Sequence, residues 1–543
     1  MARRTARRLM NGLVAVAMTV GVAAACSPAG PGEDPGGDPT RVQTASGALQ
    51  GVADGDVVRF RGVPYAQPPV GELRWAPPVP VTPWSAVRAA DRSGPPCAQS
   101  APPPAGPQVE EDCLHLDVTV PARPAAVPRP VMVWLHGGGF STGAGSDHDP
   151  RRLAAQGDVV VVTVDFRLGT FGYLALPGMI DPGSYGLQDQ QAALAWVRRN
   201  AAAFGGDPAN ITLFGQSGGA VAVCGQLTSP AARGLFDKAI LQSGSCGTTL
   251  AAGAAGPGSP AFGAFWRPMA HARRTGISVA ENLGCTDPTT RLACLRGVPA
   301  DRLLAQPTPV TAAATGDSTL PVDPRDALRS GRFADVPVLS GHTADEQRFI
   351  ANLFALLGQP VTAAAYPELI ATGFGEDADA VLGEYPLASY PDAASAWTAV
   401  HTDSGYVCPQ LDTTAALATR GPVFGYEFAD PTAPPTIPDP TGTTAGATHA
   451  SELFYLFDQP GKPVRADGSV QMLTPVQRQV ADTMIAAWTT FARTGAPPTG
   501  PGAWPAWHGL TSAVHVFTAD PGRPTRADPA ARHHCAFWAG LGR

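Results

Sequence analysis

The feature that most constrains this chain is a serine flanked by glycines, placed between an apolar run and a stretch of small residues. Ile211–Phe214 is short and largely apolar, and it leads directly into Gly215-Gln216-Ser217-Gly218-Gly219. We interpret the Ala- and Val-rich stretch that follows as a helix. A sharp strand-to-helix turn needs glycine two residues either side of the serine, because larger side chains would collide there. The pattern predicts a serine hydroxyl raised out of a sheet, beside the N–H groups of a helix N-terminus.

Short apolar runs alternate with amphipathic stretches from residue 41 onward, which is typical of a mostly parallel sheet covered by helices. The runs are nearly continuous, as expected for strands buried on both faces. The expected strands are Val131–Leu135, Val159–Asp165, Ile211–Phe214, Lys238–Leu241, Val336–Leu339 and Val423–Phe428. The expected helices are Leu187–Phe204 and a long one that Thr474 caps, Pro475 begins and Gly495 ends. With the serine turn, this predicts the α/β-hydrolase fold with helices on both faces of the sheet and long inserted loops.

The length and net charge of the chain limit the number of domains and the kinds of partner that it can bind. A chain of 543 residues is long enough for about three domains, yet large α/β enzymes often form one unit, and we expect one domain over residues 41–543. The weakly patterned residues 250–335 are expected to add helices and loops over the active site. The net charge of −7 excludes the strongly basic surface of a nucleic-acid-binding protein.

The first 40 residues are expected to lie outside the fold. Residues 1–25 place four arginines ahead of an apolar run that ends in small residues, which predicts an export signal rather than a membrane span. Ala23–Ala25 before Cys26 is similar to a bacterial lipoprotein cleavage box, so Cys26 is a candidate for lipidation. Residues 26–40 are Pro- and Gly-rich, as a tether should be. We expect a protein that is secreted or anchored to the outer face of the cell membrane.

A glycine run follows another expected strand. His136-Gly137-Gly138-Gly139-Phe140 comes directly after Val131–Leu135. Backbone amides without neighbouring side chains can approach a substrate oxygen closely, as in the oxyanion holes of esterases and lipases. Gly138, Gly139 and Gly218 are the expected donors. His136 is interpreted as structural, because it lies in the same loop.

A serine hydroxyl needs a base to become a nucleophile, and the base needs an orienting carboxylate. In this fold the order along the chain is serine, acid, histidine. Among the histidines after Ser217, His449 is the best candidate, since it lies in a glycine-containing loop after an expected strand. Asp345 and Glu346 both follow the strand Val336–Leu339, and spacing alone leaves both open as the acid.

Four further blocks of sequence resemble the type-B carboxylesterase/cholinesterase family. They are Arg61-Gly-Val-Pro-Tyr-Ala-Gln-Pro-Pro-Val-Gly71, Glu111-Asp-Cys-Leu-His-Leu-Asp-Val118, Phe204-Gly-Gly-Asp-Pro-Ala-Asn-Ile-Thr-Leu-Phe-Gly-Gln-Ser217 and Arg233-Gly-Leu-Phe-Asp-Lys-Ala-Ile-Leu-Gln-Ser-Gly244. The resemblance spans about residues 41–543. It implies a serine carboxylesterase that hydrolyses small-molecule esters through an acyl-enzyme, with no cofactor.

The resemblance also implies roles that spacing leaves open. It selects Glu346 as the acid and His449 as the base, and it implies that Ser243 lies beside the triad and that Arg74 and Glu111 form a buried ion pair. It implies the disulfides Cys97–Cys113, Cys285–Cys294 and Cys408–Cys535. Cys224 and Cys246 remain, and we expect them to pair. The even number of cysteines after Cys26 agrees with an oxidising compartment.

The chain departs from the family's pattern at three places. Gln216 stands where the family usually has Glu, and Gly218 replaces Ala but keeps the N–H donor. The segment between Cys97 and Cys113 contains no Trp, Tyr or Phe, so the ring that attracts choline in cholinesterases is absent and a cholinesterase is excluded. Two alternatives stay open: a non-catalytic binding or adhesion protein on the same fold, and amide or lactone hydrolysis by the same triad.

One cluster of candidate metal ligands occurs near the end of the chain. His533-His534-Cys535 places three such residues side by side. A single run of this kind cannot complete a tetrahedral site, so the sequence predicts no metal site.

Overall fold

The computed structural model describes most of the chain after the expected export segment. The described residues are 38–100, 108–307, 310–437, 446–458, 471–499, 504–509, 512–520, 522 and 525–542. The expected signal 1–25, Cys26 and nearly all of the tether 26–40 lie outside them. Residues Pro39–Arg543 cluster as one unit. None of the helices within the described ranges is long and apolar enough to cross a bilayer.

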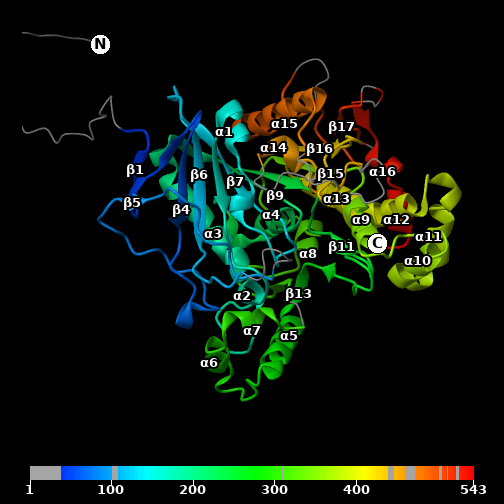
Figure 1. Cartoon of the computed structure of the whole chain (residues 1–543), viewed down its shortest axis with the longest axis horizontal. Helices are drawn as coiled ribbons and strands as arrows, with labels where there is room; N and C mark the ends of the chain where they lie inside the picture. The colour runs from blue at the N-terminus through cyan, green and yellow to red at the C-terminus, as the bar shows by residue number, and fades with distance from the viewer. Residues whose placement is uncertain are drawn as a thin grey trace, which may run out of the picture. The chain divides into compact units, whose positions relative to one another are not determined.

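An eleven-stranded sheet forms the centre of this unit, and helices lie around it (Figure 1). In spatial order its strands are β18 (Arg526–Ala527), β17 (Val514–Phe517), β16 (Val423–Phe428), β15 (Val338–Thr343), β10 (Lys238–Gln242), β9 (Gly206–Gln216), β7 (Arg129–Leu135), β8 (Val160–Val164), β6 (His115–Pro121), β4 (Val57–Pro64) and β3 (Val52–Asp54). Smaller sheets are formed by β1 (Arg41–Thr44), β2 (Gly47–Gln50) and β5 (Arg88–Ala89), by β11 (Thr249–Leu250) and β12 (Gly263–Ala264), and by β13 (Trp266–Pro268) and β14 (Ala313–Thr315).

The helices lie between and after the strands. They are α1 (Arg151–Gly157), α2 (Gly169–Tyr173), α3 (Tyr185–Asn200), α4 (Gly218–Thr228), α5 (Met269–Asn282), α6 (Arg291–Arg296), α7 (Ala300–Leu304), α8 (Pro324–Arg329), α9 (Arg348–Leu356), α10 (Tyr366–Phe374), α11 (Ala378–Glu384), α12 (Ala393–Thr402), α13 (Cys408–Leu417), α14 (Leu453–Leu456), α15 (Pro475–Thr494), α16 (Pro529–Arg532) and α17 (Cys535–Gly540). A π-helical turn, Asp403–Val407, joins α12 to α13. The region 250–335 contains helices and loops, as the sequence predicts, and also the short strands β12, β13 and β14.

The six strands expected from the sequence are β16, β15, β10, β9, β7 and β8, and they are neighbours in this order with parallel pairing throughout. They are buried on both faces, which produces the continuous apolar runs that predict them. The strands beyond β8 pair antiparallel with their neighbours. A mostly parallel sheet within an α/β fold is therefore confirmed.

Strand β15 extends further than its apolar run. The sequence predicts a strand that ends at Leu339, whereas the structure continues it to Thr343, with every residue buried. Parallel pairing with β16 holds over this whole length, from Val338 to Thr343. The backbone ladder therefore keeps polar residues, His342 among them, inside the sheet, and an apolar pattern could not predict this.

The ends of the long helix α15 follow the expected capping chemistry. The Thr474 hydroxyl accepts a hydrogen bond from the Gln477 N–H, and the Gln477 side chain accepts one in return from the Thr474 N–H at 2.9 Å. This reciprocal arrangement satisfies two amides that have no acceptor inside the helix. Gly495 ends the helix in the left-handed region with φ of 79°.

Two buried ion pairs fasten segments that are distant in sequence. The Arg74 Nε donates to Glu111 Oε2 at 2.6 Å, and Arg74 Nη1 reaches the carbonyl of Val298 at 2.7 Å. The structure thus brings together the two residues that the family resemblance pairs. The second ion pair joins Arg167 to Asp189 on α3, with nitrogen–oxygen distances of 2.8 and 2.7 Å.

Replacing Asp189 with alanine is expected to lower the free energy of unfolding by about 3–5 kcal/mol, because it leaves the Arg167 charge buried and uncompensated. The two side chains are 0% and 3% exposed, respectively. Urea unfolding measures the effect. Asp326→Ala is the matched control, since Asp326 pairs with Arg329 on the surface; it should cost within about 1 kcal/mol. Equal losses in the two variants would contradict the role of burial.

Four disulfides are formed within the described residues. They join Cys97 to Cys113, Cys224 to Cys246, Cys285 to Cys294 and Cys408 to Cys535. These are the pairings stated above for the sequence. Cys408 begins α13 and Cys535 begins α17, so this bond ties the C-terminal segment to the helices beside β15 and β16.

Candidate active site

Ser217 lies on the turn between β9 and α4. Its φ of 56° is a backbone conformation that a non-glycine residue rarely adopts. The backbone is fixed there by a hydrogen bond from the Ser217 N–H to the Gln242 carbonyl at 2.9 Å. A Cβ at Gly219 would lie 2.0 Å from the Leu135 carbonyl oxygen, which explains the glycine. The turn therefore holds a half-buried serine in a strained backbone geometry.

The glycine loop after β7 packs directly against this turn. Gly138 and Gly139 both have positive φ, of 102° and 60°, and Gly138 is exposed. A Cβ at Gly218 would lie 2.8 Å from the Gly139 nitrogen, so the loop and the start of α4 are in close contact. Gly218 is the first residue of α4, where the N–H has no acceptor inside the helix. The structure thus brings together the three expected oxyanion donors.

His449 and Glu346 are held by two adjacent loops. Glu346 follows β15 and His449 follows β16, and the His449 N–H donates to the Glu346 carbonyl at 3.2 Å. The side chains face each other, with His449 Nδ1 2.5 Å from Glu346 Oε2. The rings of Phe349 and Tyr406 pack against the imidazole at centroid distances of 5.2 and 5.0 Å. The imidazole is therefore fixed on one edge by a carboxylate and on its faces by aromatic rings.

The Glu346 carboxyl is buried but stays ionised. Burial opposes its charge, whereas the charge and hydrogen bond of His449 outweigh this cost and lower the pKa of Glu346 below its ordinary value. The Thr343 N–H adds a hydrogen bond to Oε1 at 2.9 Å. Ser243 contributes to the same shift, although its hydroxyl makes no hydrogen bond of normal geometry.

The second ring nitrogen of His449 meets the residue before the serine. Gln216 Nε2 lies 3.2 Å from His449 Nε2. Because Nδ1 carries the proton that it donates to Glu346, Nε2 keeps a lone pair and accepts from the Gln216 amide. No role for this side chain was predicted from the sequence. Its contact places the basic nitrogen of His449 next to the serine turn.

A second buried carboxyl, that of Glu452, interacts with the charge of Glu346 and was not predicted from the sequence. Burial raises the pKa of Glu452 to about 8, and the nearby charge of Glu346 adds to the shift. Gln242 Nε2 lies 3.4 Å from its Oε1, and Gln242 is itself held by the Trp488 N–H at 2.9 Å. A neutral Glu452 leaves Glu346 as the ionised member of the pair at neutral pH.

Replacing Glu452 with glutamine is expected to change the pH dependence of stability. In the unfolded chain this carboxyl ionises near its ordinary value of 4.5, whereas in the folded chain it stays protonated up to about pH 8. Between these values unfolding releases a proton, so wild-type stability falls as pH rises. Glutamine cannot ionise, so the variant should gain on the order of 5 kcal/mol relative to wild type across this window.

Urea unfolding at several pH values measures this gain. Glu376→Gln is the control, because Glu376 is exposed; it should leave the pH dependence unchanged. A stability difference between Glu452→Gln and wild type that stays constant with pH would rule out the buried neutral carboxyl.

His136, in the glycine loop, has the structural environment expected from the sequence. It is buried, and its ring stacks on Phe166 at a centroid distance of 4.4 Å. Burial lowers its pKa to about 4, so it is neutral at physiological pH. Its Nδ1 lies 2.9 Å from the Gly137 carbonyl, which anchors the start of the glycine loop.

Comparisons with known proteins agree on one family. The profile of the carboxylesterase family matches residues 38–538. The para-nitrobenzyl esterase of Bacillus subtilis is 34% identical over 88% of this chain and 95% of its own length. The fumonisin B1 esterase of Sphingopyxis macrogoltabida is 33% identical over 90% and 88%. A solved structure described as PNB esterase superposes with a TM-score of 0.72 at 31% identity, covering 92% of this chain and all of that one.

Proposed function

Because this chain belongs to the carboxylesterase family and is a carboxylic ester hydrolase, we propose that Ser217, His449 and Glu346 hydrolyse small-molecule esters through an acyl-enzyme. The observation that carries the proposal is the position of His449. One ring nitrogen lies 2.5 Å from a buried carboxylate, and the other contacts the side chain next to the serine. A base that is oriented in this way serves nucleophilic catalysis.

Acylation begins with proton transfer from Ser217 to His449. The Ser217 hydroxyl replaces the Gln216 amide as the partner of His449 Nε2 and donates to its lone pair. Nε2 then takes the hydroxyl proton as Oγ attacks the ester carbonyl carbon. Such contacts in an enzyme without substrate tighten only when substrate binds. Glu346 stays ionised, because its pKa is low, and stabilises the imidazolium that forms.

The carbonyl oxygen becomes an oxyanion that the amides of Gly138, Gly139 and Gly218 stabilise. This role of the three amides is supported by the close packing of the glycine loop against the start of α4. Donors that are fixed before the reaction need no reorganisation, and one such donor is worth about 2.7–4 kcal/mol in other hydrolases. The imidazolium then gives its proton to the leaving alcohol, and water, activated by the same imidazole, hydrolyses the acyl-enzyme.

An active-site-directed fluorophosphonate tests this proposal. It should react with one equivalent of enzyme, and peptide mapping should find the label on Ser217. Nitrophenyl esters should release a burst of nitrophenol that matches the enzyme concentration whenever deacylation limits turnover. An isosteric anilide should be cleaved far more slowly than the ester. A label on another serine, or equal rates on ester and anilide, would refute the assignment as an esterase with this nucleophile.

We also propose that the protein is exported, with Cys26 as its lipid anchor. Four disulfides in the described residues support an oxidising compartment. Fractionation of cells that produce the full chain tests this. Wild-type protein should sediment with membranes, and Cys26→Ser should appear in the soluble exported fraction. Retention of both proteins in the cytoplasm would overturn the proposal.

A further inference from the structure

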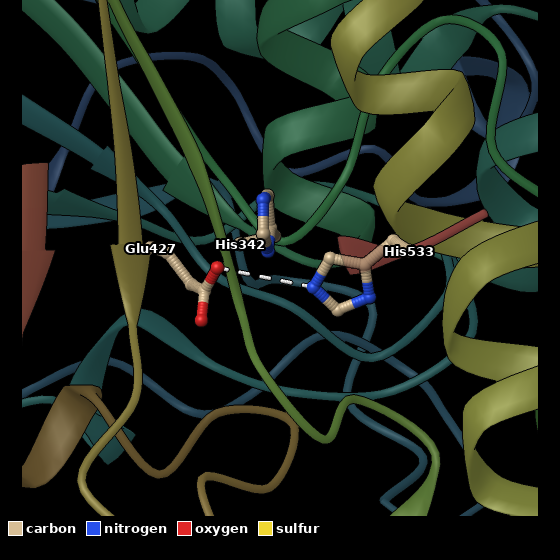
Figure 2. A group of neighbouring side chains, drawn as sticks. All are labelled: His342, Glu427 and His533. Atoms are coloured by element: carbon tan, nitrogen blue, oxygen red, sulfur yellow. Dashed lines mark ion pairs between the residues drawn. The ribbon is translucent and has the colours of Figure 1, made fainter. Parts of the chain in front are cut away.

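Three buried side chains converge on one point away from the serine. His342 comes from β15, Glu427 from β16 and His533 from the turn between α16 and α17 (Figure 2). One atom from each lies within 4.8 Å of the other two. The residues are 1%, 0% and 4% exposed, respectively. Neighbouring parallel strands and the C-terminal segment therefore bring three possible metal ligands into one buried cluster.

One buried side-chain atom of each of the three residues lacks a hydrogen-bond partner. His342 Nε2, His533 Nε2 and Glu427 Oε2 are all buried without one among the described residues. The two atoms joined by the dashed line in Figure 2, His533 Nε2 and Glu427 Oε2, are 3.8 Å apart, too far for a hydrogen bond. A buried polar atom without a partner is costly, and three that share one centre point to a missing ligand.

The outer atoms of the same residues are satisfied in the way that metal ligands require. His533 Nδ1 lies 2.6 Å from Asp403 Oδ1, and His342 Nδ1 lies 3.3 Å from the Thr343 carbonyl oxygen. Arg532 Nη1 donates to the other Glu427 oxygen, Oε1. An imidazole that donates through Nδ1 to an oxygen presents the Nε2 lone pair to a metal, and such outer partners recur around bound zinc.

We propose that His342, Glu427 and His533 bind a divalent transition-metal ion, of which zinc fits the donor set best. Two imidazole nitrogens and one carboxylate oxygen are a common zinc donor set, with a fourth position left to water. Bonds of about 2.0–2.2 Å at tetrahedral angles place ligand atoms about 3.4 Å apart, so the separations of up to 4.8 Å between the three atoms must shrink by at most about 1.4 Å. This site is separate from the serine chemistry and does not depend on it.

The charges of the three groups suit this ion. Glu427 supplies a carboxylate charge that a divalent cation offsets, and the outer nitrogen of His533, Nδ1, faces a second carboxylate, that of Asp403. His533 can bind a metal through Nε2 only when that nitrogen carries no proton, so metal binding releases any proton held there.

The position of the cluster defines its role. A surface cleft of about 510 Å³ is lined by Asp403, Arg532 and His533, which gives an ion a path to the cluster. The nearby disulfide between Cys408 and Cys535 already ties the C-terminal segment to α13. A metal at this site joins the same segment to β15 and β16, the strands that precede the loops of Glu346 and His449. We therefore assign the ion a structural role.

Cobalt titration of protein freed of metal tests the proposal. After dialysis against a chelator, the full chain should bind one equivalent of Co²⁺ with visible d–d absorption of a four-coordinate site, and Zn²⁺ should displace it. Zn²⁺ should also raise the Tm of the wild-type protein. Glu427→Gln and His533→Ala should each weaken binding by at least about tenfold and remove the Tm shift.

His534→Ala is the matched control. His534 is the sequence neighbour of His533, but its Nδ1 lies 2.6 Å from Glu384, outside the cluster; this variant should bind Co²⁺ as wild type does. Ester hydrolysis by each variant reports that it is folded. A wild-type protein that binds less than one equivalent overturns the proposal without any variant. Equal losses in His534→Ala and His533→Ala overturn it as well.

Discussion

Replacing Ser217 with alanine is expected to lower kcat for ester hydrolysis by about 10⁵–10⁶-fold, with KM changed only slightly. The variant keeps the oxyanion donors and the substrate contacts but loses the atom that forms the acyl-enzyme. In another serine hydrolase, removal of the nucleophile costs as much as removal of the whole triad, and about 10³–10⁴-fold acceleration over water remains. Alanine and serine both carry a Cβ, so a positive φ is similarly unfavourable for both residues. The substitution therefore need not change the turn.

Steady-state kinetics on a nitrophenyl ester measure this loss, and fluorophosphonate labelling should disappear with it. Ser404→Ala is the control, because the Ser404 hydroxyl only donates to the Val400 carbonyl of the same helical segment, at 2.7 Å; its kcat should match wild type. A Ser217→Ala variant that keeps more than about one hundredth of wild-type kcat would exclude Ser217 as the nucleophile.

The sheet could be predicted from the sequence where burial is symmetrical. β7, β8 and the Ile211–Phe214 part of β9 are buried, so most of their positions are apolar and each run stands out. Strands β4 and β6, which lie between β3 and β8, interleave charged with apolar residues, and the charged positions are only partly buried. Their pattern resembles that of many loops, and the hydrogen-bond ladders of β4 with β6 and of β6 with β8 identify them as strands.

The candidate site was predictable where backbone geometry demands a particular residue. A strained turn needs glycine at 215 and 219, and this requirement is written locally in the sequence. Neighbouring residues in the sequence do not show whether Asp345 or Glu346 is the acid. Asp345 N donates to the Ala447 carbonyl, and Asp345 Oδ2 accepts from the Ala447 N–H, so this residue fastens the two loops together while its neighbour faces the imidazole.

The remaining features depend on contacts across long separations. The charge of Glu346 helps to raise the pKa of Glu452, which lies more than one hundred residues away in sequence, and no spacing rule connects them. The buried cluster likewise draws His342, Glu427 and His533 from three segments. Its strand members sit in polar ends of β15 and β16 that the parallel ladder keeps inside the sheet. The sequence around His533 and His534 therefore does not indicate the other two ligands, which come from distant strands.

Replacing Glu346 with glutamine is expected to lower kcat by about 10⁴-fold while the fold and the fluorophosphonate-reactive serine remain. The glutamine amide can donate to His449 Nδ1, whereas the carboxylate can only accept from it. The ring proton then moves to Nε2, and the nitrogen that should accept the Ser217 proton is occupied. A change of this kind in a serine protease leaves the geometry intact and costs about that factor. Removal of the charge also leaves the imidazolium unstabilised.

Asp345→Asn is the matched control for this variant. It removes a charge one residue away but keeps an oxygen that can accept from the Ala447 N–H, a bond of 3.0 Å in the wild type. Its kcat should stay within about tenfold of wild type, since Asp345 contacts the backbone of the His449 loop and not the ring. Pre-steady-state kinetics with nitrophenyl esters should place the Glu346→Gln defect in both acylation and deacylation, because one imidazole serves both steps. A larger loss in Asp345→Asn than in Glu346→Gln would show that the wrong carboxylate has been assigned.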